Sequence, residues 1–297
     1  MNQERSPTYH QKMDNVCQYI SQHLDDELSV EKLSQVACFS KFHFHRQFTE
    51  YTGITVSKFI LMSRLKQASY QLVYQGDLAI IDIALQANFE NPESFSRAFK
   101  KVFSITPTQF RRKPQWQTWH QKMLLTKKID QDPTMTKTLI KALNVEIVYF
   151  DETKVAVLAH RGSPTLLNHS ISRFIEWRKS TGLSPVDKAN TYGVAYDDPA
   201  TTNAEDFRFD ICGEVKSNIP ENLQGVVNQV IPAGRCVKIR HLGSHDKMDD
   251  KIRMLYSQWL PQSGEQLRDF PCYFHYINLF PQVAEHQLIT DIYLPLK

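Results

Sequence analysis

The sequence has 297 residues and a net charge of +3, with 41% hydrophobic and 23% charged residues, which is typical of globular proteins. It contains no apolar run of ~18 residues and no signal-peptide core at its start, so we expect a cytoplasmic protein without a membrane partner. Its five cysteines are dispersed and form no CxxC pair, which predicts reduced thiols, no metal site and no cofactor.

The charge is distributed unevenly along the chain. Residues 1–113 contain 14 Lys and Arg against 11 Asp and Glu, and residues 114–141 contain 5 against 2, so each segment has a net charge of +3. Residues 142–297 contain 16 against 19, a net charge of −3. The basic first part indicates a polyanionic partner, although a basic face can also be merely solvated.

Helical periodicity runs through the first third of the chain, where apolar side chains recur three and four residues apart. Ser29 is a good N-cap, and Gly53 and Gly76 follow helical runs where a C-cap is expected. A long central helix is predicted over residues 56–75. Short helices precede it, and a second helical series follows it.

The two helical series are copies of each other. Arg46 and Phe48 align with Arg97 and Phe99 at an offset of 51 residues. Each copy has a short helix, a turn and a second helix, which is the helix-turn-helix pattern.

The second helix of each copy has two different faces. In the first copy, the apolar stripe contains Phe44, Phe48 and Tyr51. In the second copy, Asn91 is the predicted N-cap before Pro92. The apolar stripe of the second copy is predicted to contain Phe95, Phe99 and Val102. Its outer polar stripe is predicted to contain Ser94, Arg97 and Lys101.

Such a polar face suits the major groove of DNA. An arginine can pair with guanine in a fork, a histidine can donate or accept at a base edge, and a lysine can neutralise a phosphate. Two such helices on one rigid linking helix could enter successive major grooves ~34 Å apart. Arg46 and Arg97 could instead be ordinary surface arginines, but their equivalent positions in both copies favour DNA reading.

Residues 8–113 resemble the DNA-binding domain of AraC-type transcription regulators, on the segments "LSVEKLSQVACFSKFHFHRQFTEYTGITVSKFI" and "IIDIALQANFENPESFSRAFKKVFSITPTQFRR". The resemblance implies binding to double-stranded DNA. The base contacts that it implies are Phe42, His45, Arg46, Glu93, Ser94 and Arg97. The phosphate contacts that it implies are Lys41, Lys100 and Lys101.

Residues 114–141 are predicted to be a linker that is partly helical, with Trp116 and Trp119 packing on one of the domains.

From residue 145 the period becomes strand-like. Strands are expected at 145–150, 155–160, 192–196, 207–215, 272–278 and 287–294, and around Val237; helices are expected at about 164–180 and 246–260. The stretch from His160 to Ser163 is echoed from His241 to Ser244, which predicts a duplicated strand-helix-strand-strand unit with a ligand cleft between its copies.

Residues 142–297 resemble the gyrase-inhibitor-like effector-binding domain, on "IPAGRCVKIRHLGSHDKM", "LYSQWLPQSG", "PCYFHY" and "ITDIYLPL". Together the two resemblances are those of the Rob-like subgroup: an all-α double helix-turn-helix domain followed by an α+β effector domain. They imply transcriptional control by a small molecule. The residues that could line the cleft, or could instead simply be core, are Tyr192, Tyr256, Trp259, Phe274 and Tyr276. Phe274 stands where relatives usually carry a glutamate, so we expect a neutral, aromatic or lipophilic effector, or a pocket with altered use.

Two histidine and serine pairs suggest an enzyme as an alternative. His160 with Ser163 and His241 with Ser244 could form a base and a nucleophile, but no acid partner is evident and the adjacent glycines explain a turn. We therefore expect no enzyme. The alternatives are a small-molecule hydrolase in the C-terminal domain and a docking module for a protein such as RNA polymerase. A monomer is the default, because both reading helices lie in one chain.

Overall fold

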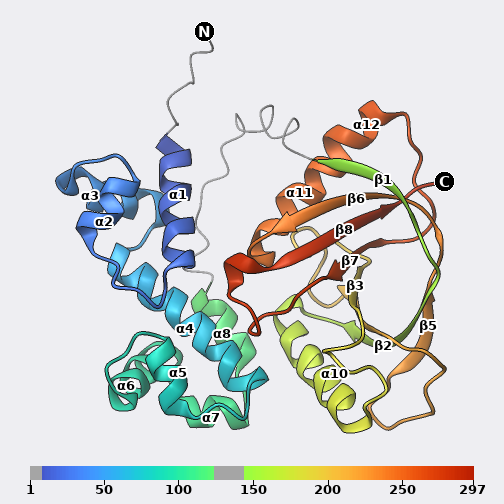
Figure 1. Cartoon of the computed structure of the whole chain (residues 1–297), viewed down its shortest axis with the longest axis horizontal. Helices are drawn as coiled ribbons and strands as arrows, with labels where there is room; N and C mark the ends of the chain where they lie inside the picture. Colours follow the sequence, from blue (N-terminus) through green and yellow to red (C-terminus); the bar gives the residue numbers. More distant parts are fainter. Residues whose placement is uncertain (1–8, 124–143) are drawn as a thin grey trace. The chain divides into compact units, whose positions relative to one another are not determined.

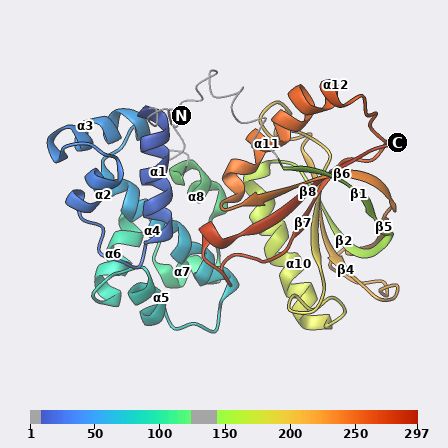
Figure 2. The same ribbon diagram turned by 45° about the horizontal axis from the view of Figure 1, so that its top comes forward.

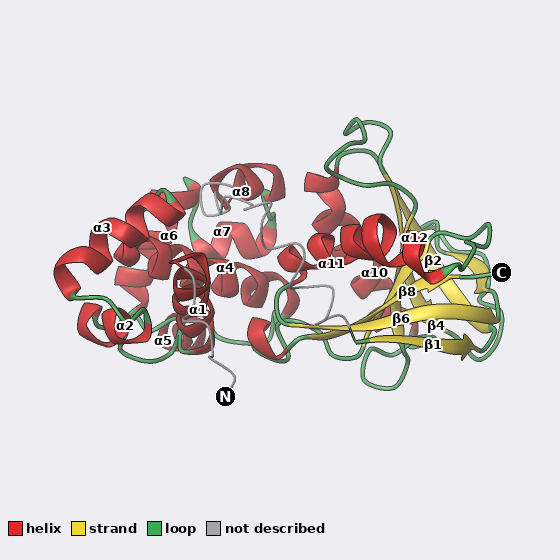
Figure 3. Ribbon diagram, turned by 90° about the horizontal axis from the view of Figure 1, so that it is seen from above, coloured by secondary structure: helices red, strands yellow, loops and turns green. Residues whose placement is uncertain are grey.

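The computed structural model describes residues 9–123 and 144–297, apart from the side chain of Phe42. The first range is helical and the second combines an antiparallel sheet with helices (Figure 3). An all-α part followed by an α+β part is therefore confirmed. None of the helices in these two ranges is long and apolar enough to cross a membrane.

The helical part contains eight helices in its described residues. Their bounds are α1 (Tyr9–Gln22), α2 (Val30–Val36), α3 (Lys41–Thr52), α4 (Val56–Tyr74), α5 (Ile80–Gln86), α6 (Pro92–Phe103), α7 (Pro107–Arg112) and α8 (Trp116–Met123) (Figure 1). Local chemistry fixes several of these bounds. Ser29 accepts a hydrogen bond from the backbone N–H of Lys32 and so caps α2, and Gly53 ends α3 with a left-handed φ of 73°.

Helix α4 belongs to two apolar cores at once. Its first turns, with Val56 and Ile60, pack with α1, α2 and α3. Its later turns, with Leu65 and Leu72, pack with α5 to α8. Each helix-turn-helix unit therefore has its own core, and α4 is the element that both cores share.

Helix α8 lies in the segment that the sequence predicts to be a linker. Trp116 and Trp119 are buried and contact the ring of Tyr70 on α4, with centroids 5.5 and 5.3 Å away. Residues 116–123 thus pack on the helical part, because their two indoles complete its second core. Residues 124–141 of the predicted linker lie outside the described residues.

Eight strands form one antiparallel sheet in the second part. Their bounds are β1 (Val145–Phe150), β2 (Thr153–Arg161), β3 (Thr191–Ala195), β4 (Arg208–Glu214), β5 (Val227–Ile231), β6 (Gly234–Leu242), β7 (Cys272–Tyr276) and β8 (Ile289–Pro295). The order across the sheet is β1-β6-β8-β7-β3-β4-β2-β5. Strand β5 was not predicted. The first four of its five side chains are exposed, so its sequence does not alternate between apolar and polar residues as that of a half-buried strand does.

Short links force this sheet to curve. Residues 151 and 152 alone join β1, at one end of the sheet, to β2, near the other end, and residues 232 and 233 join β5 to β6 in the same way. A chain this short can connect such distant positions only if the two ends of the sheet approach each other. Figure 2 shows the resulting curvature.

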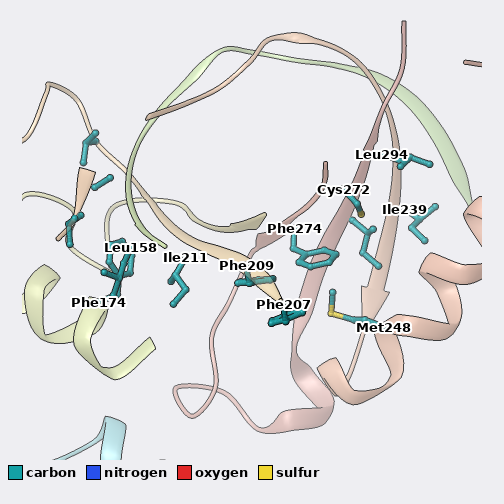
Figure 4. Close-up of a cluster of buried hydrophobic side chains, with 14 of the residues drawn as sticks. Leu158, Phe174, Phe207, Phe209, Ile211, Ile239, Met248, Cys272, Phe274 and Leu294 are labelled. Atoms are coloured by element: carbon teal, nitrogen blue, oxygen red, sulfur yellow. The ribbon is translucent and has the colours of Figure 1, made fainter. Parts of the chain in front are cut away.

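The two faces of the sheet have separate cores, because successive side chains alternate between faces. One face is covered by α10 (Leu167–Thr181) and α11 (Met248–Met254), and its core includes Phe174, Phe209 and Phe274 (Figure 4). We call it the helix-covered face. The other face lies inside the curve of the sheet and buries mainly valine and tyrosine side chains; we call it the inner face.

Candidate nucleic-acid interface and ligand-binding face

Helix α3 separates its apolar and polar side chains as predicted. Phe44, Phe48 and Tyr51 are buried, which confirms the apolar stripe. His45 and Arg46 are exposed on the opposite side. The side chain of Phe42 lies outside the described residues, so its expected base contact stays a prediction.

Helix α6 repeats this arrangement in the second unit. Asn91 caps it by accepting from the backbone N–H of Ser94 at 2.8 Å, which confirms the predicted N-cap. Glu93 and Arg97 are exposed, whereas Phe95 and Phe99 are buried. The next fully buried position is Phe103 rather than the predicted Val102, which is only half-buried, because this turn continues the apolar stripe at a spacing of four residues.

Two residues of the predicted interface already have partners. The ammonium of Lys41 lies 3.1 Å from the carboxylate of Glu31, and both side chains are 59% exposed, so water screens this pair. The hydroxyl of Ser94 donates to the carbonyl of Asn91 at 2.8 Å. Lys41 must therefore leave Glu31 to reach a phosphate, and Ser94 is left mainly as an acceptor.

The remaining basic side chains differ in their roles. Arg97, Lys100 and Lys101 are exposed along α6. Arg111 instead donates to the carbonyl of Leu78 at 2.7 Å and is part of the fold of the second unit. Arg97, Lys100 and Lys101 thus form one exposed basic stripe on α6.

The helix-covered face has an aromatic centre above a glycine. Gly193 on β3 lies opposite Phe274 on β7 in the sheet register. A Cβ atom at position 193 would lie 2.5 Å from Cζ of Phe209 and 2.9 Å from the hydroxyl of Tyr276. The ring of Phe274 is 6.3 Å from that of Phe209 and 6.3 Å from that of Tyr276. Only glycine leaves room for these rings, so Gly193 is the floor of the aromatic centre.

The structure does not bring Tyr192 together with these rings. Tyr192 lies opposite His275 in the register and stacks on it at 4.7 Å, and it belongs to the core of the inner face. The reason is the two-residue period of a strand, which points Tyr192 away from the side that Gly193 faces. Burial raises the pKa of Tyr192 to about 12, so its phenol stays neutral.

Tyr256 and Trp259 lie on a π-helical segment, Leu255–Trp259, that follows α11. Trp259 is half-buried and packs against the core of the helix-covered face, whereas Tyr256 is 40% exposed. A π-helical turn shifts the side chains after it relative to a regular α-helix, and such turns are frequent at functional sites. Trp259, Phe274 and Tyr276 therefore contribute to one core, and Tyr256 lies on the adjoining helix surface.

The buried acids of the sheet face away from the aromatic centre. Among the described residues, the buried carboxylates are Asp210 on β4 and Asp291 on β8, which are 2% and 3% exposed. Asp210 pairs with Arg161 at 2.8 Å, and Asp291 pairs with both ends of the Arg240 guanidinium at 2.7 and 2.8 Å. They alternate in sequence with Phe209 and Ile292, which line the helix-covered face, so their charges are held on the inner face.

The histidine and serine pairs are turn structures. Nε2 of His160 donates to the backbone carbonyl of Ser163 at 3.1 Å, and Nε2 of His241 donates to that of Ser244 at 2.8 Å. The serine hydroxyls instead cap the short helices that follow. Burial lowers the pKa of both imidazoles. Nδ1 of His160 lies 2.8 Å from the hydroxyl of Ser170 on α10, so the serine hydroxyl that this imidazole contacts is not the one of the predicted pair.

Sequence reasoning missed Gly193 and Phe209 at the aromatic centre. The available signal was the lone glycine inside the predicted strand at 192–196, because a strand glycine often marks a close approach of another group. His245 was also missed; its ring lies 5.1 Å from that of Tyr276. No group of three or more His, Cys, Asp or Glu side chains that could hold a metal occurs within residues 9–123 and 144–297.

Comparison with known proteins gave matches for both parts of the chain. Residues 143–297 match the family of GyrI-like small molecule binding domains, and residues 33–113 match a helix-turn-helix domain family. The probable transcriptional regulator YgiV of Escherichia coli strain K12 is 51% identical over 154 residues, which is 52% of this chain and 96% of YgiV.

Two further matches cover other parts of the chain. The right origin-binding protein of Escherichia coli strain K12 is 38% identical over 98 residues, which is 33% of this chain and 34% of that protein. The cryo-EM structure of the EcmrR–DNA complex in EcmrR-RPo gives a TM-score of 0.47 and 16% identity, covering 90% of this chain and 98% of that chain.

Proposed function

This chain belongs to the GyrI-like family of small-molecule binding domains and carries an AraC-type helix-turn-helix domain ahead of that domain, and from this premise we propose that it regulates transcription in a sequence-specific way. In this proposal the helical part reads DNA, and the sheet part binds a small molecule that alters this reading. The observation that carries the proposal is the pair of exposed arginines, Arg46 and Arg97, at equivalent positions of the two helix-turn-helix units.

In this proposal α3 and α6 enter successive major grooves of double-stranded DNA. Neither guanidinium of Arg46 and Arg97 has a hydrogen bond to another described residue, so both forks are available to a guanine edge. The proposed additional base contacts are Phe42, His45, Glu93 and Ser94. Lys41, Lys100 and Lys101 would neutralise phosphates and set the register of the protein on the duplex.

The proposed effector is a neutral aromatic molecule on the helix-covered face. This proposal is supported by the apolar lining of that face, where Phe209 and Phe274 are buried and Tyr276 and Trp259 are half-buried, and by the buried acids, which lie on the inner face. Burial raises the pKa of Tyr276, so its hydroxyl would be a neutral hydrogen-bond donor. The order β2-α10-β3-β4 followed by β6-α11-β7-β8 supports the proposed duplication of the strand-helix-strand-strand unit.

Other functions are supported less well. The serines next to His160 and His241 serve as caps, which does not favour a hydrolase built on them. Docking to RNA polymerase stays a prediction.

The proposal is tested by selecting bound DNA from a random library with the full chain, beside Arg46→Ala, Arg97→Ala and Lys101→Ala. We expect the wild type to enrich an asymmetric motif of two half-sites about one helical turn apart. Each arginine variant should lose ~1–3 kcal/mol on the selected site and relax the sequence of one half-site.

Lys101→Ala is the matched control for this experiment. It should weaken binding to all sequences alike and reduce the salt dependence of binding, as expected for a phosphate contact. Equal losses on selected and random DNA for Arg46→Ala and Arg97→Ala would refute a base-reading role.

A further inference from the structure

The backbone carbonyl of Asp26 ties three segments of the helical part together. Asp26 lies in the loop between α1 and α2, in the first helix-turn-helix unit. Its carbonyl accepts a hydrogen bond from the guanidinium of Arg64 on α4 at 2.9 Å and one from the side-chain amide of Asn88 at 2.9 Å. Arg64 also donates to the carbonyl of Leu24 in the same loop at 2.8 Å. We call these three hydrogen bonds, two to Asp26 and one to Leu24, the Asp26 brace.

Asn88 connects the second unit directly to the first. It lies in the turn between α5 and α6, with a left-handed φ of 57°. The equivalent turn residue of the first unit is Cys38, with a φ of 53°. Both residues donate their backbone N–H three residues back, to Leu85 and Gln35 respectively, so the two turns have the same backbone. The side chain of Asn88 adds a bond to the other unit, and so the turn next to the reading helix α6 is attached to the loop of the first unit.

The brace supplies what the apolar packing of α4 does not. Apolar contacts are non-directional, and each unit packs on its own stretch of α4. Hydrogen bonds are directional and lose strength steeply when the angle at the donor changes. The bond from Asn88 therefore restricts how far the turn before α6 can move relative to the first unit, and the two bonds from Arg64 fix the accepting loop on α4.

We propose that Arg64 and Asn88 are positioning residues that set the distance between the two reading helices and thereby the spacing of half-sites that the protein accepts. The inference rests on the proposed function, in which α3 and α6 read successive grooves. One base pair more or less between the half-sites displaces one of them by about 3.4 Å along the DNA and rotates it by about a tenth of a turn. A pair of reading helices held at a fixed distance discriminates against that change, and a loosely held pair tolerates it.

The test compares the affinity of the full chain for its selected site with its affinity for the same site with one base pair inserted or removed between the half-sites. Asn88→Gly removes the amide but keeps the left-handed turn, which glycine adopts without strain. Cys38→Gly makes the same kind of change at the equivalent turn and removes no bond of the brace. Arg64→Met removes the other donor and retains an unbranched side chain along α4.

We expect the discrimination between the selected spacing and the altered spacings to fall about 5-fold in Asn88→Gly, as loss of one hydrogen bond of ordinary net strength gives. Arg64→Met should lower it further, since it removes two bonds, and Cys38→Gly should leave it unchanged. Affinity for DNA with a single half-site should be the same in the wild type and in Asn88→Gly, which a general loss of folding would not allow.

Unchanged spacing discrimination in both Asn88→Gly and Arg64→Met would overturn the inference while leaving the proposed function intact. An equal loss in Cys38→Gly would also overturn it, because the effect would then come from the turn backbone. If the wild type selects no two-part sequence at all, the proposed function itself fails, and this inference fails with it.

Discussion

At the scale of single residues, the alternation of side chains along β4 and β8 decides what a ligand would meet. Asp210 and Asp291 point to the inner face, and their neighbours in sequence, Phe209 and Ile292, point to the helix-covered face. A cation on the helix-covered face would be held by ring faces alone, at ~0.5–2 kcal/mol for each ring. That gain does not offset the loss of hydration of a buried charge.

We therefore predict that the protein prefers a neutral ring to a cationic one of the same shape. The probes are 2-naphthol and N,N,N-trimethyl-2-naphthylammonium, titrated against the full chain by calorimetry. The neutral probe should bind at least ~10-fold more tightly, because the cation loses its hydration without gaining a carboxylate. Tight binding of the ammonium probe, weakened by salt, would contradict this prediction.

Phe274→Glu is a matched variant for the same titration. It introduces a carboxylate beside Phe209, so above pH 8, where even a buried glutamate with a raised pKa begins to ionise, the preference should shift towards the ammonium probe. Phe274→Leu removes the ring without adding a charge and should weaken both probes. Circular dichroism of both variants checks that the sheet part remains folded.

At the scale of elements, the two helices proposed to read DNA, α3 and α6, differ in how their first turns are capped. Asn91 caps α6 through its side chain, whereas Ser40, at the same place before α3, makes no side-chain cap bond. We predict that Asn91→Ala destabilises the first turn of α6 by ~1 kcal/mol, seen as about 5-fold faster amide hydrogen exchange in residues 92–103.

Ser40→Ala is the control for this prediction and should change exchange in α3 by less than half as much, since it breaks no cap bond. Equal effects of the two substitutions would show that the cap of α6 contributes nothing specific.

The helices were readable from the sequence because their signals are local. The central helix predicted over residues 56–75 is α4, Val56–Tyr74. The predicted N-cap Asn91 does cap α6, because the side chain of this single residue marks where the helix begins. Tyr192 was grouped with the other aromatic residues on its chemistry alone. Its face depends on the register with β7, which pairs residues that are distant in sequence, and no local pattern gives that register.

At the scale of the whole molecule, the order of strands was beyond the sequence for a similar reason. A two-residue link between strands ordinarily indicates a hairpin. Here the links at 151–152 and 232–233 join strands that do not pair with each other. Strand β1 pairs instead with β6 at one end of the sheet, and β2 pairs with β5 at the other end. Curvature of the whole sheet makes this possible, and curvature is a property of many strands together rather than of any one segment.

A regulator of the proposed kind must also couple its two bound partners. If a small molecule changes the affinity of the chain for DNA by some factor, the DNA must change the affinity for the small molecule by the same factor, because the two binding equilibria form a closed cycle. We predict that 2-naphthol changes the Kd for the selected DNA site by roughly 5- to 150-fold, the range usual for allosteric coupling. Fluorescence anisotropy with labelled DNA measures this factor, and calorimetry of 2-naphthol with and without DNA should give the same factor.

Arg46→Ala provides the control, since under conditions where it no longer holds the selected site, added DNA should leave its affinity for 2-naphthol unchanged. Binding of both partners to the wild type with no effect of either on the other would contradict the proposed regulation. The helical part and the sheet part would then be two independent binding domains in one chain, and the small molecule would have to act on a step other than DNA binding.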